Sequence, residues 1–301
     1  MTRFFLGVNT CFAVKRWPEP EVWASLVKNE LGLDLVQHSL DLVDLDTSRD
    51  EIMTQATEVT HACERTGLHV TSTFTGLCAY SSNLLLSPNA DSRHRALAWY
   101  RKTIEFTAAL GAVATGGHVG AFSVRDYRDP TRRVELESSL RDSLRELAGY
   151  ALSCGLEYLI IENLAAAREP STMTGIRGLL TEGDDEHVPI RLCLDIGHQC
   201  VPGTAGAERD PYAWLEQMSA LAPIIQLQQS DAEADHHWPF TEHTNALGRI
   251  DAARVLEAVS RSGAEEVALI LEIIPSFEAD DDAVLADMVA SVEYWRQALS
   301  S

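Results

Sequence analysis

Basic residues are scarce in this chain. Its 301 residues include 24 Lys and Arg against 45 Asp and Glu, which gives a formal net charge of −21 at pH 7. An acidic surface repels the phosphate backbone of nucleic acids, and no stripe of Lys and Arg offsets that repulsion here. The sequence therefore predicts no nucleic-acid partner, and the excess of acidic residues favours solubility.

Long apolar runs and paired cysteines are also missing. No segment approaches the roughly 18 apolar residues that a membrane-spanning helix requires, so we expect no membrane partner. The N-terminal segment MTRFFLGVNTCFAV resembles a signal peptide only weakly, because Asn9 and Thr10 interrupt it and no small-residue cleavage site follows. We interpret it as a first strand and expect a cytoplasmic protein. The six cysteines show no CxxC spacing, which predicts reduced thiols rather than a disulfide framework.

Strand-like and helix-like segments alternate along the chain. The apolar runs are rich in Val, Ile and Leu and lack polar alternation, as strands buried on both faces of a parallel sheet do. Eight such runs occur, at residues 4–9, 33–37, 69–74, 111–117, 156–162, 190–195, 224–229 and 267–273. Helical patterns lie between them. In the pattern over 47–67, Thr47 and Asp50 suggest a capping box and Gly67 a helix end.

This alternation predicts an α/β fold, a single (β/α)8 TIM barrel, since eight β/α units in about 250–300 residues are typical of that architecture. A doubly wound open sheet is the structural alternative, and it favours a Gly-rich turn after its first strand. The turn here reads NTCFAVKRW and holds no GxGxxG motif, which favours the barrel. No Pro-, Gly- or Ser-rich linker divides the chain, so we expect residues 1–301 to form one domain.

Side chains with oxygen donors end four consecutive strands of the predicted barrel. They are Glu162, Asp195, Gln228 and Glu272. In such a barrel the carboxyl ends of the strands line one shared pocket. Three carboxylates in one dry pocket repel one another, and a divalent cation removes that cost. Carboxylate and amide oxygens suit Mn²⁺ or Mg²⁺, with Co²⁺ as another option. Taken singly, each acid has the alternative of capping a helix or pairing with an Arg.

Two histidines are expected at the same end of the barrel. His198 follows Asp195 by three positions, so we expect it to contact a substrate hydroxyl or to ligate the metal, or else to cap a helix. His118 closes the fourth strand in TGGHVGAFS, where two glycines allow close approach of a ligand. A packed strand-end histidine is the alternative there.

The loops supply further candidates for binding substrate. His236 and His237 lie in the loop after the seventh strand, and imidazoles in an acidic protein can bind a phosphate or a sugar. A surface loop that contacts a partner is the alternative. Lys15 and Arg16 are rare cations after the first strand. We consider them candidates for an anionic substrate group, the alternative being solvated charges.

The strand-end motifs together resemble a known superfamily. The segments LIIEN, LDIGH, QLQQSD and LILEIIP resemble the xylose-isomerase-like barrels, in particular their ketose 3-epimerase and sugar-phosphate isomerase branch. Finer features, LGVNTCFAVKRW, TGGHVGAFS, HHWPFT and LEIIPSFE, are similar to erythrulose-phosphate 3-epimerases. The resemblance implies a divalent-metal-dependent epimerase or isomerase of a short ketose or ketose phosphate. Among these substrates, the resemblance favours a tetrulose phosphate such as erythrulose 1-phosphate, epimerised at carbon 3.

The resemblance also implies roles for individual residues. Glu162 and Glu272 would bind the metal and exchange protons with the substrate carbon, Asp195 would be a ligand, and His198 would contact substrate. Metal-assisted removal of a proton beside a ketone gives an enediolate, and a second acid on the opposite face makes the reaction an epimerisation. Relatives often pair into dimers or tetramers, which implies a homodimer or homotetramer.

One position departs from the family pattern. Most relatives place a histidine ligand on the seventh strand, where this chain has Gln228, or Gln226 if the register shifts by two. An amide oxygen favours Mn²⁺ or Mg²⁺ over zinc-like metals, and Mn²⁺ is our preferred ion. Alternatively, neither Gln ligates, and water or His198 takes the place.

Other functions on this scaffold remain as alternatives. A lyase or dehydratase, similar to inosose dehydratases or to enzymes that cleave C-glycosides, would use the same scaffold. An abasic-site endonuclease is disfavoured by the acidic composition and by the glutamine on the seventh strand. A non-catalytic sugar-binding barrel would bind its ligand without needing the metal.

Overall fold

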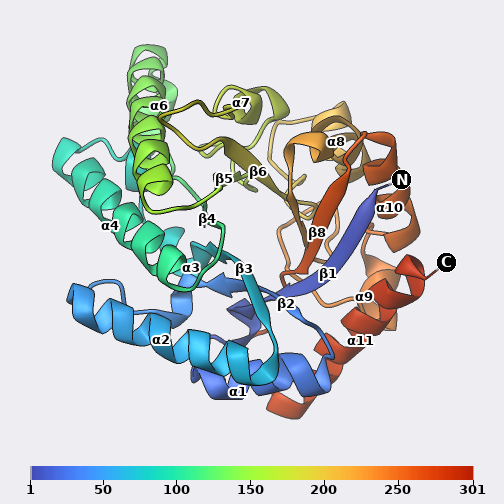
Figure 1. Cartoon of the computed structure of the whole chain (residues 1–301). Coiled ribbons are helices and arrows are strands. Elements are labelled where there is room, and N and C mark those ends of the chain that lie inside the picture. The colour runs from blue at the N-terminus through green and yellow to red at the C-terminus, as the bar shows by residue number, and fades with distance from the viewer. Residues whose placement is uncertain (1, 301) are drawn as a thin grey trace.

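Eight parallel strands close into a barrel in the order of the chain within residues 2–300, which this computed structural model describes (Figure 1). They are β1 (Arg3–Asn9), β2 (Leu35–Ser39), β3 (His69–Phe74), β4 (Ala114–Gly117), β5 (Tyr158–Glu162), β6 (Ile190–Asp195), β7 (Ile224–Leu227) and β8 (Glu266–Leu271). The barrel closes where β1 pairs with β8, from Arg3 opposite Glu266 to Val8 opposite Leu271. The predicted (β/α)8 TIM barrel is confirmed, and the doubly wound open sheet is excluded.

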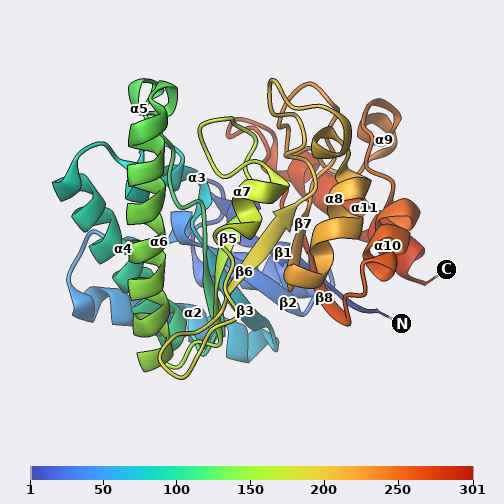
Figure 2. The same ribbon diagram turned by 90° about the horizontal axis from the view of Figure 1, so that it is seen from above.

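Helices surround this barrel (Figures 1 and 2). They include α1 (Pro20–Ser25), α2 (Arg49–Thr66), α4 (Ala90–Ala109), α6 (Pro130–Ser153), α8 (Pro211–Met218), α10 (Ala252–Arg261) and α11 (Asp281–Leu299). Short helices follow the carboxyl ends of several strands: α3 (Gly76–Ala79), α5 (Val124–Arg128), α7 (Met173–Arg177) and α9 (Glu242–Leu247). Among residues 2–300, no helix is both long enough and apolar enough to cross a membrane.

The start of α2 corrects one detail of the sequence analysis. Its capping box consists of Ser48 and Glu51, not of Thr47 and Asp50. The Ser48 hydroxyl accepts from the Glu51 backbone N–H at 3.3 Å, and the Glu51 carboxylate accepts from the Ser48 N–H at 3.1 Å. Gly67 ends the helix as predicted, with a left-handed φ of 71° that glycine adopts without strain.

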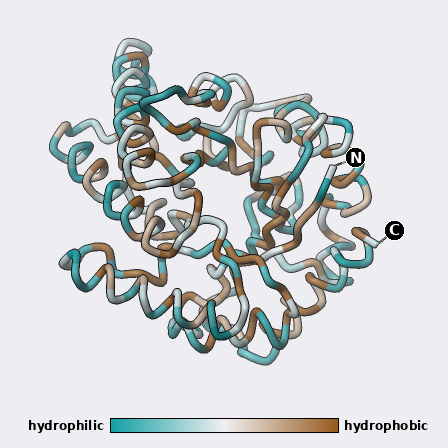
Figure 3. The backbone as a smooth tube through the Cα atoms, viewed as in Figure 1, coloured by the Kyte–Doolittle hydropathy of each residue, from teal (hydrophilic) through white to brown (hydrophobic). Residues whose placement is uncertain are grey.

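The core has two layers, one between strands and helices and one inside the barrel. The outer layer buries Trp23, Trp214 and Trp295 completely. The inner layer is a small apolar cluster of Phe74, Ala114, Ile160, Cys193, Ile224 and Ile270. Figure 3 shows the strands as largely hydrophobic and the outer helices as mixed, as expected for helices that bury one face.

The inner cluster fixes where polar side chains enter the barrel. Successive side chains of a strand alternate between its two faces, so a residue two positions further on points the same way. Glu162 therefore follows Ile160 into the barrel, Asp195 follows Cys193, and the residue after β8 follows Ile270. The apolar cluster closes the interior below these polar side chains.

Candidate functional site

Three buried carboxylates meet above the apolar cluster. Glu162 ends β5, Asp195 ends β6, and Glu272 directly follows β8. One oxygen from each carboxylate lies within 4.8 Å of the other two. Glu162 and Asp195 are fully buried and Glu272 is 4% exposed. The structure thus brings the three acids named from the sequence to a single point, which we call the carboxylate cluster.

The carboxylate cluster is electrostatically costly without a counter-charge. Burial raises the pKa of Glu162 to about 8, with the negative charge of Asp195 adding to the shift. Burial, together with the charges of Glu162 and Asp195, also raises the pKa of Glu272 well above its ordinary value. The Oε1 atom of Glu162 is buried and has no hydrogen-bond partner within the described chain. An unpartnered oxygen in an all-oxygen donor set fits a hard divalent cation such as Mn²⁺, Mg²⁺ or Co²⁺.

Both glutamines of the seventh unit point into the barrel, but they present different atoms. Gln226 lies opposite Asp195 in the β6–β7 register. Its amide nitrogen donates to Glu272 Oε1 at 2.8 Å and to Gln37 Oε1 at 2.9 Å, while its own Oε1 is buried and has no hydrogen-bond partner among residues 2–300. Asn9 also donates to Glu272 Oε1, at 3.1 Å, and to Gln37 Oε1, at 2.8 Å. Gln226 therefore has a free oxygen beside the cluster.

Gln228 has different neighbours, and it turns its amide nitrogen toward the carboxylates of Asp195 and Asp235. Its amide nitrogen is 3.1 Å from both carboxylate oxygens of Asp195, and its oxygen accepts from the His237 backbone N–H at 2.6 Å. That backbone bond fixes which end of the amide faces Asp195. The metal ligation predicted for Gln228 stays a prediction, and the orientation of its amide favours Gln226 as the oxygen donor.

His198 and His237 approach the cluster from two loops and share Asp235. The Nε2 atom of His198 lies 3.3 Å from Asp235 and that of His237 3.2 Å from it. Ligand atoms of Asp195, His198 and His237 also lie within 4.8 Å of one another. Burial opposes the charged form of His237, but the carboxylates of Asp235 and Glu272 outweigh it and raise its pKa to about 9. His237 has a φ of 49°, a strained conformation that these contacts hold.

The other predicted histidines lie apart from the carboxylate cluster. His118 is fully buried and stacks on Tyr80, with ring centroids 4.6 Å apart. Burial lowers its pKa to about 4, so its ring is neutral at pH 7. His236 stacks on Trp238 at 3.7 Å and pairs with Asp231 at 3.1 Å.

Lys15 and Arg16 take different positions although they are neighbours in sequence. The Arg16 guanidinium donates to the carbonyls of Ala279, at 2.7 Å, and Ser276, at 2.9 Å, and pairs with Asp281. It therefore holds the segment between β8 and α11 instead of facing a pocket. Lys15 has a left-handed φ of 61°, and its ammonium lies 4.2 Å from the centroid of the Phe277 ring.

Sequence reasoning missed two residues of the site. The Tyr80 hydroxyl donates to Glu162 Oε2 at 2.7 Å. Asp235 pairs with both His198 and His237. Its position two residues before His237 was the available signal, since a DxH pair on a loop can place both groups at one point. No spacing pattern pointed to Tyr80.

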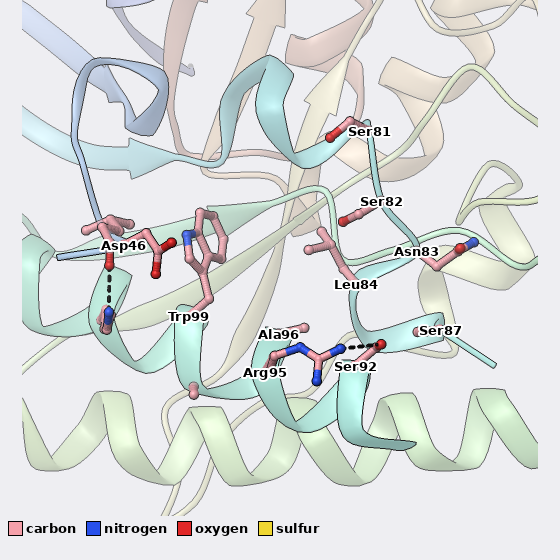
Figure 4. A pocket seen from close by; sticks show the side chains of 13 residues that line it. Asp46, Ser81, Ser82, Asn83, Leu84, Ser87, Ser92, Arg95, Ala96 and Trp99 are labelled. Carbon is pink, nitrogen blue, oxygen red and sulfur yellow. Dashed lines mark hydrogen bonds between the residues drawn. The ribbon is translucent and has the colours of Figure 1, made fainter. Parts of the chain in front are cut away.

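Two of the hollows near this end of the barrel bear on the site, and Glu272 of the carboxylate cluster lines one of them. A cavity of about 260 Å³ is lined by Cys11, Phe74, Gly76, Leu77, Tyr80, Asp235, His237, Glu272 and Ile274. A larger groove of about 800 Å³ lies outside, between α4 and the segment after α3, and contains Ser81, Ser82, Arg95 and Trp99 (Figure 4). None of the cluster carboxylates lines the groove. The smaller cavity is the candidate active site.

Comparison with known proteins agrees with this geometry. Residues 27–297 match the family model described as xylose isomerase-like TIM barrel. The chain belongs to this family. It is 29% identical over 296 residues to D-erythrulose 1-phosphate 3-epimerase of Brucella abortus (strain 2308), covering 96% of this chain and 94% of that protein. The superfamily resemblance seen in the sequence is confirmed.

Solved structures of other members share the architecture. The crystal structure of a putative xylose isomerase from Rhodospirillum rubrum ATCC 11170 is 35% identical, with a TM-score of 0.90, covering 98% of this chain and 99% of that one. D-Psicose 3-epimerase from Clostridium cellulolyticum H10 is 16% identical, with a TM-score of 0.69, covering 98% and 99% of the two chains. At that identity the second likeness is one of fold.

Proposed function

We propose that the chain is a divalent-metal-dependent 3-epimerase of a short ketose phosphate, with erythrulose 1-phosphate as the preferred substrate. The convergence of Glu162, Asp195 and Glu272 in one buried cluster is the observation that carries this proposal. The likeness to D-erythrulose 1-phosphate 3-epimerase supports the choice of sugar. The cavity of about 260 Å³ beside the cluster suits a four-carbon substrate better than a large one.

The carboxylates of the cluster would hold the metal ion, and the free oxygen of Gln226 completes the set of oxygen donors. A bound divalent cation supplies Lewis acidity at the ketone oxygen, which lowers the cost of removing the proton on the neighbouring carbon. We propose Mn²⁺ as the ion, with Mg²⁺ or Co²⁺ as substitutes, because every donor in this set is a hard oxygen.

Glu162 and Glu272 are the acid–base pair of the proposed reaction. One takes the proton from carbon 3, and the other returns a proton to the opposite face, which inverts the configuration. Glu162 ends β5 and Glu272 directly follows β8, with Asp195 of β6 between them in the barrel order. Raised pKa values for both carboxyl groups suit residues that carry a proton during part of the cycle.

Histidines and one lysine are the proposed substrate contacts. His198 and His237 border the cluster and are placed to bond substrate hydroxyls. Lys15 is the proposed phosphate anchor, because its ammonium has no carboxylate partner within the described chain, whereas Arg16 is already bonded. Contacts from His118 and His236 stay predictions, as do a homodimer or homotetramer and a cytoplasmic location.

The test is incubation of the Mn²⁺-loaded protein in heavy water with D- and L-erythrulose 1-phosphate, free erythrulose, and pentulose and hexulose phosphates. We expect deuterium at carbon 3 and interconversion of the two erythrulose 1-phosphates. Dehydrated or cleaved products with no epimer would favour a lyase or dehydratase instead. Binding of the sugar phosphate with EDTA present, and no turnover with metal, would indicate a non-catalytic barrel.

A further inference from the structure

The two oxygens of Glu162 have different surroundings. Oε2 accepts the hydrogen bond from Tyr80, and Oε1 has no hydrogen-bond partner among residues 2–300. His198 Nδ1 lies 3.5 Å from Oε1. One hydroxyl therefore decides which oxygen of this carboxylate is left for the metal and which faces the cavity beside Tyr80.

The phenol ring of Tyr80 is itself held from two sides. His118 stacks against it with an interplanar angle of 15°. The helix α3 that precedes Tyr80 is tied down by Asp41, whose carboxylate accepts from the backbone N–H groups of Leu77, at 2.6 Å, and Cys78, at 2.9 Å. Gly76 begins this helix with a φ of 68°, and a Cβ there would lie 2.4 Å from Asp41 Oδ2. The stacking on His118 and the hydrogen bonds to Asp41 together fix the position of the Tyr80 hydroxyl.

Tyr80 also lines the cavity together with Glu272. It is 38% exposed, whereas the carboxylate it contacts is fully buried. A phenol hydroxyl keeps its proton at neutral pH, so Tyr80 is a hydrogen-bond donor to this carboxylate. A donor of this kind restrains rotation of the carboxylate, and small errors in placing a proton-transfer group cost large factors in rate.

We propose that Tyr80 is a positioning residue for Glu162, orienting the oxygen that exchanges the proton of carbon 3, and that His118 is the platform that orients Tyr80. This inference rests on the proposed epimerase function. It assigns a role to the loop after β3, and it gives the buried ring of His118, stacked on Tyr80, a task that needs no contact with substrate.

The experiment uses Tyr80→Phe, which removes the hydroxyl and keeps the stacked ring. The rate constant kcat should fall about tenfold or more, with KM changed less than about twofold, because substrate binding does not need the hydroxyl. Mn²⁺ affinity, measured by titration calorimetry without substrate, should change less than about threefold, because the free Oε1 is untouched. His118→Ala should lower kcat in the same direction, and His118→Phe should restore most of it.

Isotope effects separate a role at Glu162 from general damage to the site. D- and L-erythrulose 1-phosphate, each deuterated at carbon 3, are epimerised separately by the wild type and by Tyr80→Phe. In one direction Glu162 removes the labelled proton, and in the other Glu272 does. The two primary isotope effects should therefore diverge in the variant, rising or staying maximal in one direction and falling in the other.

A matched control is Tyr150→Phe, since the Tyr150 hydroxyl donates to Glu105 in another Tyr–Glu pair outside the cavity. It should leave all these quantities unchanged. An unchanged kcat in Tyr80→Phe, or isotope effects that move together, would overturn the proposal. If the wild type epimerises neither sugar phosphate, the proposed function itself fails, which is a different result from an active wild type with an equally active variant.

Discussion

The amide nitrogen of Gln228 lies 3.1 Å from each carboxylate oxygen of Asp195, so one side chain restrains both oxygens of a buried acid. The same amide accepts from the backbone N–H of His237, which joins the carboxylate to the loop after β7. Gln228 therefore links loop position to carboxylate orientation, and Gln226, one inward position earlier, has an amide oxygen with no hydrogen-bond partner in the part of the chain that the structure describes.

This arrangement predicts which glutamine sets the preference for metal. Gln226→His replaces a hard oxygen by an imidazole nitrogen and should shift the Zn²⁺ to Mn²⁺ affinity ratio toward Zn²⁺ by about tenfold. Gln228→His, the matched variant, should weaken binding of both ions without changing the ratio. Competition titrations with the two ions measure this, and a larger shift in the ratio for Gln228→His would return the ligand role to Gln228.

Neutralising one member of the carboxylate cluster should abolish activity and stabilise the metal-free fold. We expect Glu272→Gln to lower kcat by a factor of about 10³, because one half of the proton transfer is lost. Without metal, the same change removes charge repulsion in a buried site and should add about 1 kcal/mol to the free energy of unfolding. Denaturant titrations in EDTA test the second part, with exposed Glu157→Gln as a neutral control. A destabilised Glu272→Gln would contradict the repulsion argument.

The stability of the metal-free protein should fall as the pH rises from about 4.5 to about 8. Glu162 has a folded-state pKa raised to about 8, so the folded state holds a proton that the unfolded state releases near 4.5. Its stabilising contribution is complete below the unfolded pKa and is lost as the pH passes the folded one. His237, raised from 6.5 to about 9, acts in the same direction at higher pH.

Melting temperatures in EDTA and in excess Mn²⁺ across this pH range check the prediction. The stabilisation by metal should increase with pH, since the ion binds the deprotonated carboxylates. A metal effect that does not vary between pH 5 and pH 8 would show that the cluster does not hold the ion.

Replacing Lys15 should affect substrate binding, whereas replacing Arg16 should affect stability. Lys15→Met should raise KM for erythrulose 1-phosphate about tenfold or more, because a single ammonium–phosphate contact is lost. The KM for free erythrulose, which has no phosphate, should stay unchanged. Arg16→Met should instead lower the melting temperature, because it removes bonds to the Ala279 and Ser276 carbonyls. Steady-state kinetics and thermal melts decide this, and equal KM values for Lys15→Met and the wild type would exclude it as the anchor.

The sequence was informative about the strands because apolar runs, glycine stops and terminal acids coincide in this fold. Its residues 69–74 and 190–195 are β3 and β6 without any shift. The fourth strand begins later than expected, at Ala114, because Gly111, with a φ of 70°, still belongs to the turn that ends α4. The residue at which a strand or helix begins or ends depends on such turn geometry, and the pattern of apolar residues does not encode it.

The choice between the two glutamines lay beyond sequence reasoning for a different reason. Gln226 and Gln228 share the same parity along the strand, so alternation directs both inward. Only the pairing of Gln226 with Asp195 across strands, and the bond from His237 to Gln228, distinguish them. Tyr80 and Arg16 likewise owe their roles to partners far along the chain, Glu162 and the segment before α11.

Asn9 at the end of β1 shares an acceptor, Glu272 Oε1, with Gln226, and shares Gln37 with it as well. Glu272, the proposed acid–base group near the chain's C-terminus, is thus held by a side chain from the N-terminal strand. Weakening the pairing of β1 with β8 would displace this proposed acid–base group while most of the hydrophobic interior stayed intact. Any redesign of the N-terminal strand is for this reason also a redesign of the chemistry.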